Sequence, residues 1–253
     1  MISKLILNTI PRGVLLKLSY WVRPFLVLWY KGNKFTDPID NKSYRKFLPY
    51  GYAVQRPNVL APGTLSLERH RLLWLYLQQE TDFFTSPKKV LHIAPEQAFL
   101  KRFKKQNNLD YTTADLFSPL ADIKADITDL PFEDNTYDVI FCNHVLEHIE
   151  DDTKAMKELF RVLKKGGMGI FQIPQDLSRK TTYEDFSITD PKERAKHFGQ
   201  YDHVRIYGHD YFDKLRAVGF TVTPIDYKNK INSKLFEKYR LAKGELLPVC
   251  YKQ

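Results

Sequence analysis

The sequence predicts an α/β protein with a mostly parallel β-sheet and helices on both of its faces. Short apolar runs alternate with amphipathic stretches from residue 89 to residue 251. Residues 125–174 contain two apolar, buried strands on either side of an amphipathic helix, joined by short connections. The composition, 43% hydrophobic and 27% charged, allows a sizeable core in a soluble protein.

The strand and helix assignments follow the pattern of apolar residues. Residues 137–142 form a near-continuous apolar run, typical of a strand buried on both faces. A helix is expected to begin at Asp151 or Asp152, whose charges favour a helix N-terminus, and to stop at Gly166. Pro248 indicates that the last strand lies at an edge or carries a bulge. We expect strands at residues 89–94, 109–115, 122–125, 137–142, 169–174, 220–226 and 245–251, and further helices at 97–106 and 209–218.

The basic charge is concentrated in the N-terminal region. Residues 1–56 contain ten Lys or Arg and two acids, and therefore carry +8 of the chain's net charge of +9. Such a basic region could bind nucleic acid or an anionic membrane surface. A solvated basic face is an equally open alternative.

Residues 14–30 are apolar but too short for a membrane-spanning helix, and Lys17, Arg23 and Pro24 interrupt them. They lack the small-residue cleavage site of a signal peptide. Three interpretations remain open: a helix packed on the main domain, a helix lying in a membrane interface, or a surface for a partner protein. Pro24 is expected to bend or split any helix here.

A link between two regions is expected near residue 85. Ser66 can cap a helix that runs to about Glu80, and the polar residues 81–88 lead into the next apolar run. We therefore divide the chain into an N-terminal region, 1–85, and a main domain, 86–253. Only two cysteines are present, and Cys142 falls in a predicted strand, so a reducing, cytoplasmic location is expected.

Two motifs of the main domain resemble a known family. The turn N-H-V-L-E-H (143–148) after a buried strand and the stretch D-H-V-R-I-Y (202–207) are similar to those of class I S-adenosylmethionine (SAM) dependent methyltransferases of the type 11 kind. The resemblance implies a Rossmann-like, seven-stranded sheet with an antiparallel last strand, and SAM as the cofactor. The cofactor would lie beyond the carboxyl ends of the first, second and fourth strands.

The resemblance also implies which residues hold the cofactor. After the first strand, the family's Asp and first two glycines are replaced by His92, Ala94 and Glu96. Glu96 could pair with the ammonium group of SAM, although an acid that stabilises a helix N-terminus is an open alternative. Asp115 is expected at the ribose hydroxyls. Asp126 and Ile127 are expected at the adenine, and Asn143 and His144 at the methionine end. The full predicted set is His92, Ala94, Glu96, Asp115, Leu116, Asp126, Ile127, Asn143 and His144.

The acceptor side is expected to use residues from the turn after the fourth strand, the end of the fifth strand and the 202–207 stretch. His203, as the base, and His144 and Tyr207 are the expected catalytic residues. The residues expected to bind the acceptor are Arg205 and Gln172. A purely structural hydrogen-bond cluster at 202–207 is an open alternative. No metal site is expected, because His144 and His148 are four residues apart with no third ligand apparent in the sequence.

The N-terminal region also resembles a companion segment of some methyltransferase relatives, in which two C-x-x-C pairs form a zinc ribbon. This chain has Asp37, Asp40, Ala61 and Thr64 at the four ligand positions, so we expect no zinc. If the ribbon shape persists, hydrophobic contacts must replace the metal. The expected contact residues are Phe35, Tyr44, Phe47, Leu48 and Tyr50.

The resemblance implies a SAM-dependent methyltransferase acting on a small or lipid-linked acceptor, with peripheral contact to the inner membrane surface through residues 1–31 as one expectation. A catalytically inactive, methyltransferase-like binding or scaffold protein is the alternative. A third interpretation is an RNA or protein methyltransferase that uses the basic region; it predicts strongly salt-dependent polynucleotide binding. Nucleic acid is the less favoured partner.

Overall fold

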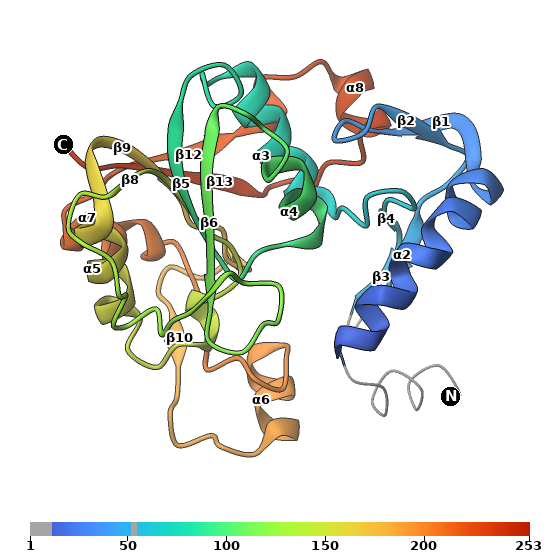
Figure 1. Ribbon diagram of the computed structural model, residues 1–253. Coiled ribbons are helices and arrows are strands. Elements are labelled where there is room, and N and C mark those ends of the chain that lie inside the picture. Colours follow the sequence, from blue (N-terminus) through green and yellow to red (C-terminus); the bar gives the residue numbers. More distant parts are fainter. Residues whose placement is uncertain (1–11, 52–54) are drawn as a thin grey trace.

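A seven-stranded sheet forms the centre of the molecule, in the order β12-β13-β9-β8-β5-β6-β7 (Figure 1). The computed structural model describes residues 12–51 and 55–253. The strands of this sheet are β5 (Lys88–Ile93), β6 (Leu109–Asp115), β7 (Ile123–Lys124), β8 (Tyr137–Cys142), β9 (Leu163–Ile170), β12 (Thr221–Asp226) and β13 (Leu246–Tyr251).

The strand directions confirm the predicted fold class. Strands β5 to β9 pair in parallel, and β13 is antiparallel to both β9 and β12. This is the Rossmann-like class I methyltransferase arrangement, with the last strand reversed. The prediction that Pro248 marks an edge strand is wrong, because β13 lies between β9 and β12. Pro248 is tolerated because β13 pairs with β9 only from Val249 onward, so Pro248 itself is not part of that pairing.

The helix that follows β8 ends earlier than predicted. Asp151 caps α5 (Asp152–Val162) by accepting a hydrogen bond from the Lys154 N–H. The helix ends at Val162, and Gly166 has a positive φ of 76° but lies inside β9, four residues beyond the helix end. The fifth strand therefore begins earlier than residue 169. The left-handed glycine serves the irregular register between β8 and β9 rather than a helix stop.

Helices cover both faces of the sheet. One core contains residues of α5 and of α7 (Tyr211–Val218), which packs beside α5. The other core contains residues of α3 (Glu68–Gln79), α4 (Gln97–Phe103) and α8 (Ser233–Lys238). Helix α3 thus packs against the sheet although it precedes the predicted boundary at residue 85. Ser66 does not cap α3, because Leu67 occupies the cap position and the Ser66 hydroxyl donates to Asp37 instead.

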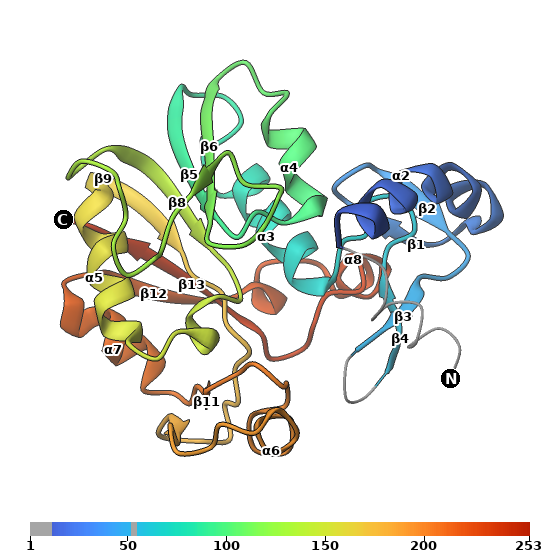
Figure 2. The same ribbon diagram turned by 60° about the horizontal axis from the view of Figure 1, so that its bottom comes forward.

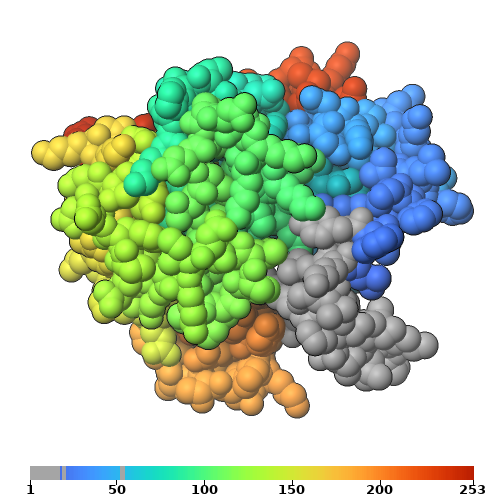
Figure 3. Space-filling model, viewed as in Figure 1, coloured from blue at the N-terminus to red at the C-terminus, as the bar shows by residue number. Residues whose placement is uncertain are grey.

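The N-terminal unit, residues 12–51 and 55–61, forms a lobe beside the main body (Figures 1 and 3). Helix α2 (Arg12–Trp29) is followed by two antiparallel hairpins. Pro24 lies inside α2 and does not split it, so of the two expected effects, a bend or a split, the split is wrong. The strands of the hairpins are β1 (Lys31–Asp37), β2 (Lys42–Tyr44), β3 (Leu48–Tyr50) and β4 (Arg56–Leu60).

The four positions compared with zinc ligands lie in one cluster, formed by this unit and the turn that follows it. Asp37 accepts hydrogen bonds from the hydroxyls of Thr64 and Ser66, and the Tyr44 hydroxyl donates to Asp40 over 3.4 Å. Ala61 packs with Tyr44 and Phe47, and Phe35 packs against them. Of the other expected contact residues, Leu48 is absent from this cluster and Tyr50 is 48% exposed. Polar as well as apolar contacts therefore hold the two hairpins together.

An excursion between β9 and α7 extends beyond the sheet (Figure 2). It contains the short strands β10 (Tyr183–Glu184) and β11 (Arg205–Ile206), which pair with each other, and helix α6 (Pro191–Phe198). Two 3-10 turns, η1 (Leu146–His148) and η2 (Tyr227–Asn229), complete the described elements. Across residues 12–51 and 55–253, the helices fall short of the length and apolar character that crossing a membrane would require.

Candidate active site

The residues predicted to bind the cofactor follow three neighbouring strands. The carboxyl ends of β5, β6 and β8 lie at one edge of the sheet because these strands are parallel. Open α/β sheets place their ligands at this edge. The turns that leave it contain Ala94–Glu96, Asp115–Ser118 and Asn143–His148.

The turn after β5 keeps the backbone shape of the missing glycine. Ala94 has a φ of 51°, in the left-handed region that glycine adopts without strain. An alanine there costs about 1 kcal/mol or more in backbone strain. Ala94 therefore adopts a backbone conformation that a glycine would adopt without strain.

Glu96 lies at the centre of a buried hydrogen-bond network. Its Oε1 is 2.7 Å from His70 Nε2, and its Oε2 accepts a hydrogen bond from the Asn143 side-chain amide over 3.0 Å. His70 Nδ1 accepts the backbone N–H of Leu67, so its Nε2 carries the hydrogen that is donated to Glu96. Burial alone would raise the pKa of Glu96, but His70, His92 and Arg69 together hold that pKa well below its usual value. Burial also lowers the pKa of His70 to about 4, so a neutral His70 faces an ionised Glu96.

His92 is a core residue rather than a cofactor ligand. Its side chain is fully buried, and its Nδ1 is 2.7 Å from the Tyr111 hydroxyl. The rings of Phe99, Phe103 and Phe141 surround it. Its Nε2 lies 3.5 Å from Glu96 Oε2, so His92 contributes to the site through Glu96.

Asp115 is placed as predicted, at the end of β6 on an open cleft of about 270 Å³. Its Oδ1 accepts the backbone N–H groups of Phe117 and Ser118, which holds the carboxylate at the cleft. Leu116 and Phe117 line the same cleft, and Phe117 is 86% exposed. An acid beside exposed apolar side chains suits a ligand that has both hydroxyl groups and a flat ring.

Asp126 and Ile127, which were predicted to contact the adenine, lie in different surroundings. Asp126 is exposed and accepts hydrogen bonds from the N–H and hydroxyl of Thr128. Ile127 is buried in the core beside α5, so it does not line the cleft with Asp115. The expectation that Ile127 covers an adenine ring from inside the cleft therefore finds no support in its position.

A second, polar cleft of about 210 Å³ lies beyond the ends of β8 and β9. His144, Arg69 and Glu245 line it, together with residues 173–175. Burial raises the pKa of Glu245 to about 7, because the opposing effect of Arg69 and Arg56 is smaller. Gln172 is buried behind the cleft and donates weakly to Glu245 over 3.4 Å. The sequence reasoning missed Arg69 and Glu245, since each lies in an element that was interpreted only as a helix or a strand.

His144 is the predicted catalytic residue that reaches this cleft. Its backbone is left-handed, with a φ of 55°, and its N–H donates to the Gln172 carbonyl over 2.7 Å. Its Nδ1 lies 3.2 Å from Glu147 Oε1, a contact that lacks the alignment of a hydrogen bond. Asn143 and His144 are therefore both at the predicted edge of the sheet.

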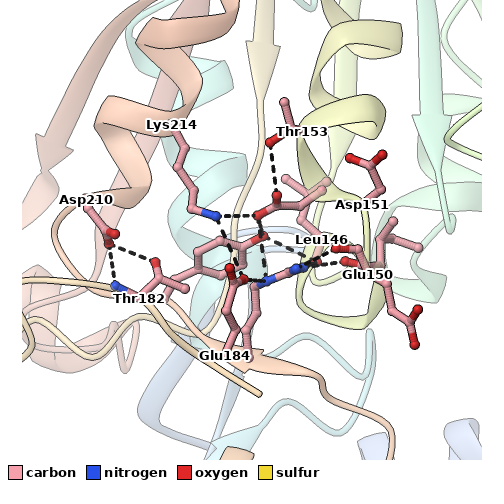
Figure 4. A network of polar contacts seen from close by, with 12 residues as sticks. Leu146, Glu150, Asp151, Thr153, Thr182, Glu184, Asp210 and Lys214 are labelled. Carbon is pink, nitrogen blue, oxygen red and sulfur yellow. Dashed lines mark hydrogen bonds and ion pairs between the residues drawn. The ribbon is translucent and has the colours of Figure 1, made fainter. Parts of the chain in front are cut away.

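Arg205 and Tyr207 are positioned for structure rather than for an acceptor, which corrects the prediction. The Arg205 guanidinium donates to the carbonyls of Leu146, Ile149 and Glu150 and to the Glu184 carboxylate. The buried Tyr207 hydroxyl donates to Asp152 over 2.8 Å. Figure 4 shows Leu146, Glu150, Glu184 and Lys214 converging on this network. The open alternative of a structural cluster at residues 202–207 accounts for both side chains.

His203 also lies away from the two clefts. Its imidazole is almost fully buried, and its Nδ1 is 3.2 Å from the Phe198 carbonyl. Its ring packs at right angles against that of His148, with 4.7 Å between the centroids. His203 and His144 are therefore not neighbouring catalytic groups, although both contact the region around Glu147.

Part of the chain is similar to known methyltransferases. Residues 76–171 match the methyltransferase domain family. The chain is 37% identical over 69 residues to the ubiquinone/menaquinone biosynthesis C-methyltransferase UbiE of Idiomarina loihiensis, a stretch that covers 26% of this chain and 28% of UbiE. It is 27% identical over 106 residues to the malonyl-[acyl-carrier protein] O-methyltransferase of Nitrosospira multiformis, with 41% of this chain and 32% of the relative covered.

Among solved structures, the [4+2]-cyclase SpnF is similar with a TM-score of 0.49 and 12% identity, over 85% of this chain and 89% of SpnF. The chain matches less than a third of the length of each of the two curated relatives. SAM is the cofactor that the methyltransferase match implies. The Asp115 carboxylate borders an open cleft and fits the ribose hydroxyls of SAM. Residues 76–171, the part that matches the methyltransferase domain family, contain the strands β5 to β9 of the central sheet.

Proposed function

We propose that the protein is a SAM-dependent methyltransferase that acts on a small or lipid-linked acceptor. The observation that carries this proposal is the Asp115 carboxylate, held at the end of the second strand of a class I sheet on an open cleft. The methyltransferase domain match over residues 76–171 supports it.

The residues at the sheet edge have distinct roles in this proposal. Asp115 accepts hydrogen bonds from ribose hydroxyls, and Leu116 and Phe117 cover the adjacent ring. Glu96 provides the negative charge that faces the amino acid end of the ligand. Asn143 and His70 keep Glu96 in place by donating to it. When bound, SAM supplies a methyl group on a positively charged sulfur, which the acceptor takes while the electron pair of the carbon–sulfur bond stays on sulfur.

The polar cleft at His144 is the acceptor side of the proposal. Arg56, Arg69 and Lys243 bring positive charge to it, and Glu245 brings a carboxyl group. His144 presents its imidazole to hydrogen-bond the acceptor. Because the methyl donor is already reactive, the main task of these groups is to align the acceptor and limit water.

The exposed face of α2 supports a lipid-linked acceptor. Trp21, Phe25, Leu28 and Trp29 are each between 71% and 76% exposed, and their spacing places them on one side of the helix. Arg45 lies against the rings of Trp29 and Tyr30, and Lys31 and Lys34 are exposed nearby. A helix with exposed aromatic residues and flanking cations suits the interface of an anionic bilayer.

The alternative is a methyltransferase-like binding protein without catalysis. The buried network around Glu96 favours it, because His70, Asn143 and His92 already surround the carboxylate that the cofactor would need to reach. The two proposals make opposite statements about SAM binding.

Calorimetric titration with SAM and with S-adenosylhomocysteine tests the proposal. We expect micromolar binding by the unaltered protein and a loss of at least tenfold for Asp115→Ala. The control is Asp110→Ala, an exposed acid at the opposite end of the same strand, which is expected to bind normally. Absence of binding by the folded, unaltered protein would contradict the methyltransferase proposal and favour the non-catalytic one.

A further inference from the structure

We propose that Glu147, His148 and His203 form a binding site for a divalent transition-metal cation. One carboxylate oxygen and one ring nitrogen from each histidine lie within 4.8 Å of one another. Glu147 and His148 belong to η1 after β8, whereas His203 comes from the turn that precedes β11. Metal binding is separate from methyl transfer and is tested independently of it.

The Glu147 carboxylate lacks the hydrogen bonds that a buried charge needs. The residue is 1% exposed, and neither carboxylate oxygen has a hydrogen-bond partner. His144 Nδ1 lies 3.2 Å from Oε1 but is not aligned for a hydrogen bond. Glu96, in the same region, has two donors. A buried carboxylate without donors is expensive to keep unless a cation coordinates it.

The two imidazoles are held as metal-ligating histidines usually are. His148 Nδ1 is 3.1 Å from the Asp202 carbonyl and 3.5 Å from its carboxylate, and His203 Nδ1 is 3.2 Å from the Phe198 carbonyl. A carbonyl that accepts from Nδ1–H leaves the lone pair on Nε2. Such acceptors fix the tautomer and ring orientation of histidines that bind metals through the other nitrogen.

The donor set indicates the class of metal. Two imidazoles and one carboxylate suit Zn²⁺ and neighbouring divalent transition metals, whereas Mg²⁺ and Ca²⁺ prefer oxygen ligands. Around a zinc ion with ligands at about 2.0–2.1 Å, neighbouring donor atoms lie about 3.3 Å apart. The three donors therefore need to move inward by about 1 Å. Three protein ligands leave a coordination position for water or another oxygen ligand.

A cation here would attach the excursion to the sheet. The backbone already makes one such link, since the Val204 N–H donates to the Glu147 carbonyl over 3.0 Å. A bound cation would add a second link, because His203 and the residues of η1 would coordinate the same ion. Because His144 contacts Glu147 from the side of the polar cleft, occupancy of the metal site would also influence the order of that cleft.

The test is Zn²⁺ titration of chelator-treated, full-length protein by calorimetry, with metal analysis after gel filtration. We expect one equivalent to bind with micromolar or tighter affinity. His203→Ala and Glu147→Gln are each expected to weaken binding at least 100-fold. The matched control is His197→Ala, which removes an imidazole beside another carboxylate, that of Glu193, in α6. This control should bind Zn²⁺ like the unaltered protein.

Two results would overturn the proposal. One is a folded, metal-free protein that takes up no stoichiometric Zn²⁺, Co²⁺ or Mn²⁺. The other is unchanged affinity in both folded ligand variants. If His203→Ala does not fold, the near-isosteric Glu147→Gln decides alone. SAM titration of the metal-free protein distinguishes failure of this site from failure of the proposed methyltransferase function, and equally tight Mg²⁺ binding would overturn the metal class.

Discussion

Glu96 and Glu147 are buried carboxylates in neighbouring turns, and their surroundings differ. Glu96 accepts hydrogen bonds from His70 and Asn143, and these contacts satisfy its charge. The Glu147 side chain is more deeply buried, 2% exposed against 11% for Glu96, but has no hydrogen-bond donor. Their residue types and positions after strands could be predicted from the sequence. Their partners could not, because His70 and His203 reach them from distant parts of the chain.

Glu245 makes a pH-dependent contribution to stability. Burial raises the pKa of its carboxyl group to about 7 in the folded protein, so the folded state holds this proton more tightly than the unfolded chain. The free energy of unfolding should therefore fall as the pH rises from about 4.5 to about 7, and then level off. Urea unfolding at pH 5 and pH 8 measures this fall. We expect the fall in the free energy of unfolding between pH 5 and pH 8 to be smaller in Glu245→Gln by roughly 1–3 kcal/mol.

Arg69 and Arg56 oppose this shift and Glu68 adds to it, so the comparison is made against a control acid. Glu237→Gln removes an exposed carboxylate in α8 and should leave the difference between the two pH values unchanged. An identical pH response of Glu245→Gln and the unaltered protein would show that Glu245 titrates normally.

At the scale of elements, α2 combines two roles that the sequence left open. Val27 packs against the hairpins that follow the helix, and Tyr30, just beyond its end, packs there too, whereas Trp21, Phe25 and Trp29 face outward. Helical spacing alone predicted an apolar helix but not which side would be covered. The hairpins decide this, because their cluster of Tyr44, Phe47 and Ala61 uses only one side of the helix.

The outward face of α2 should bind anionic vesicles. We expect the full-length protein to float with liposomes that contain an anionic lipid, less so at high salt. Phe25→Asp combined with Trp29→Asp should reduce the bound fraction at least tenfold, since burial of each aromatic side chain is worth about 1.5–3 kcal/mol.

Leu235→Asp provides the matched control, because Leu235 is an exposed apolar residue of α8 on a different element. It should float like the unaltered protein. Equal flotation of the α2 double variant and this control would rule out the membrane-facing role of α2.

At the scale of the whole molecule, Arg205 attaches the excursion to the edge of the sheet. Its guanidinium contacts η1, the loop that precedes α5, and Glu184 of β10. Lys214 of α7 also pairs with Glu184 and with Asp152. The sequence showed an acid, a histidine, an arginine and a tyrosine close together, which also suits an acceptor site. Only the packing shows that the arginine and the tyrosine point into the protein.

Removing the Arg205 guanidinium should destabilise the protein without abolishing cofactor binding. Arg205→Met leaves the carbonyls of Leu146, Ile149 and Glu150 without this donor and removes the closest cation from Glu184. Because several buried acceptors lose their partner together, we expect a loss of about 3–5 kcal/mol in the free energy of unfolding measured with urea. Arg179→Met, which breaks an exposed pair with Asp176, should cost less than about 1 kcal/mol. Normal stability with lost acceptor turnover in Arg205→Met would restore the original acceptor-binding prediction.

The sequence by itself determined the fold class, most of the strands and the acids that follow them. Apolar periodicity, helix-starting acids and the buried run at 137–142 are local signals, and local signals specify elements and their alternation. The tertiary structure alone decided that Pro248 lies in an interior strand, that Gly166 belongs to β9, and that His203 faces Glu147. These features depend on which surfaces pack together, and contacts between residues far apart in the chain leave no periodic trace in the sequence.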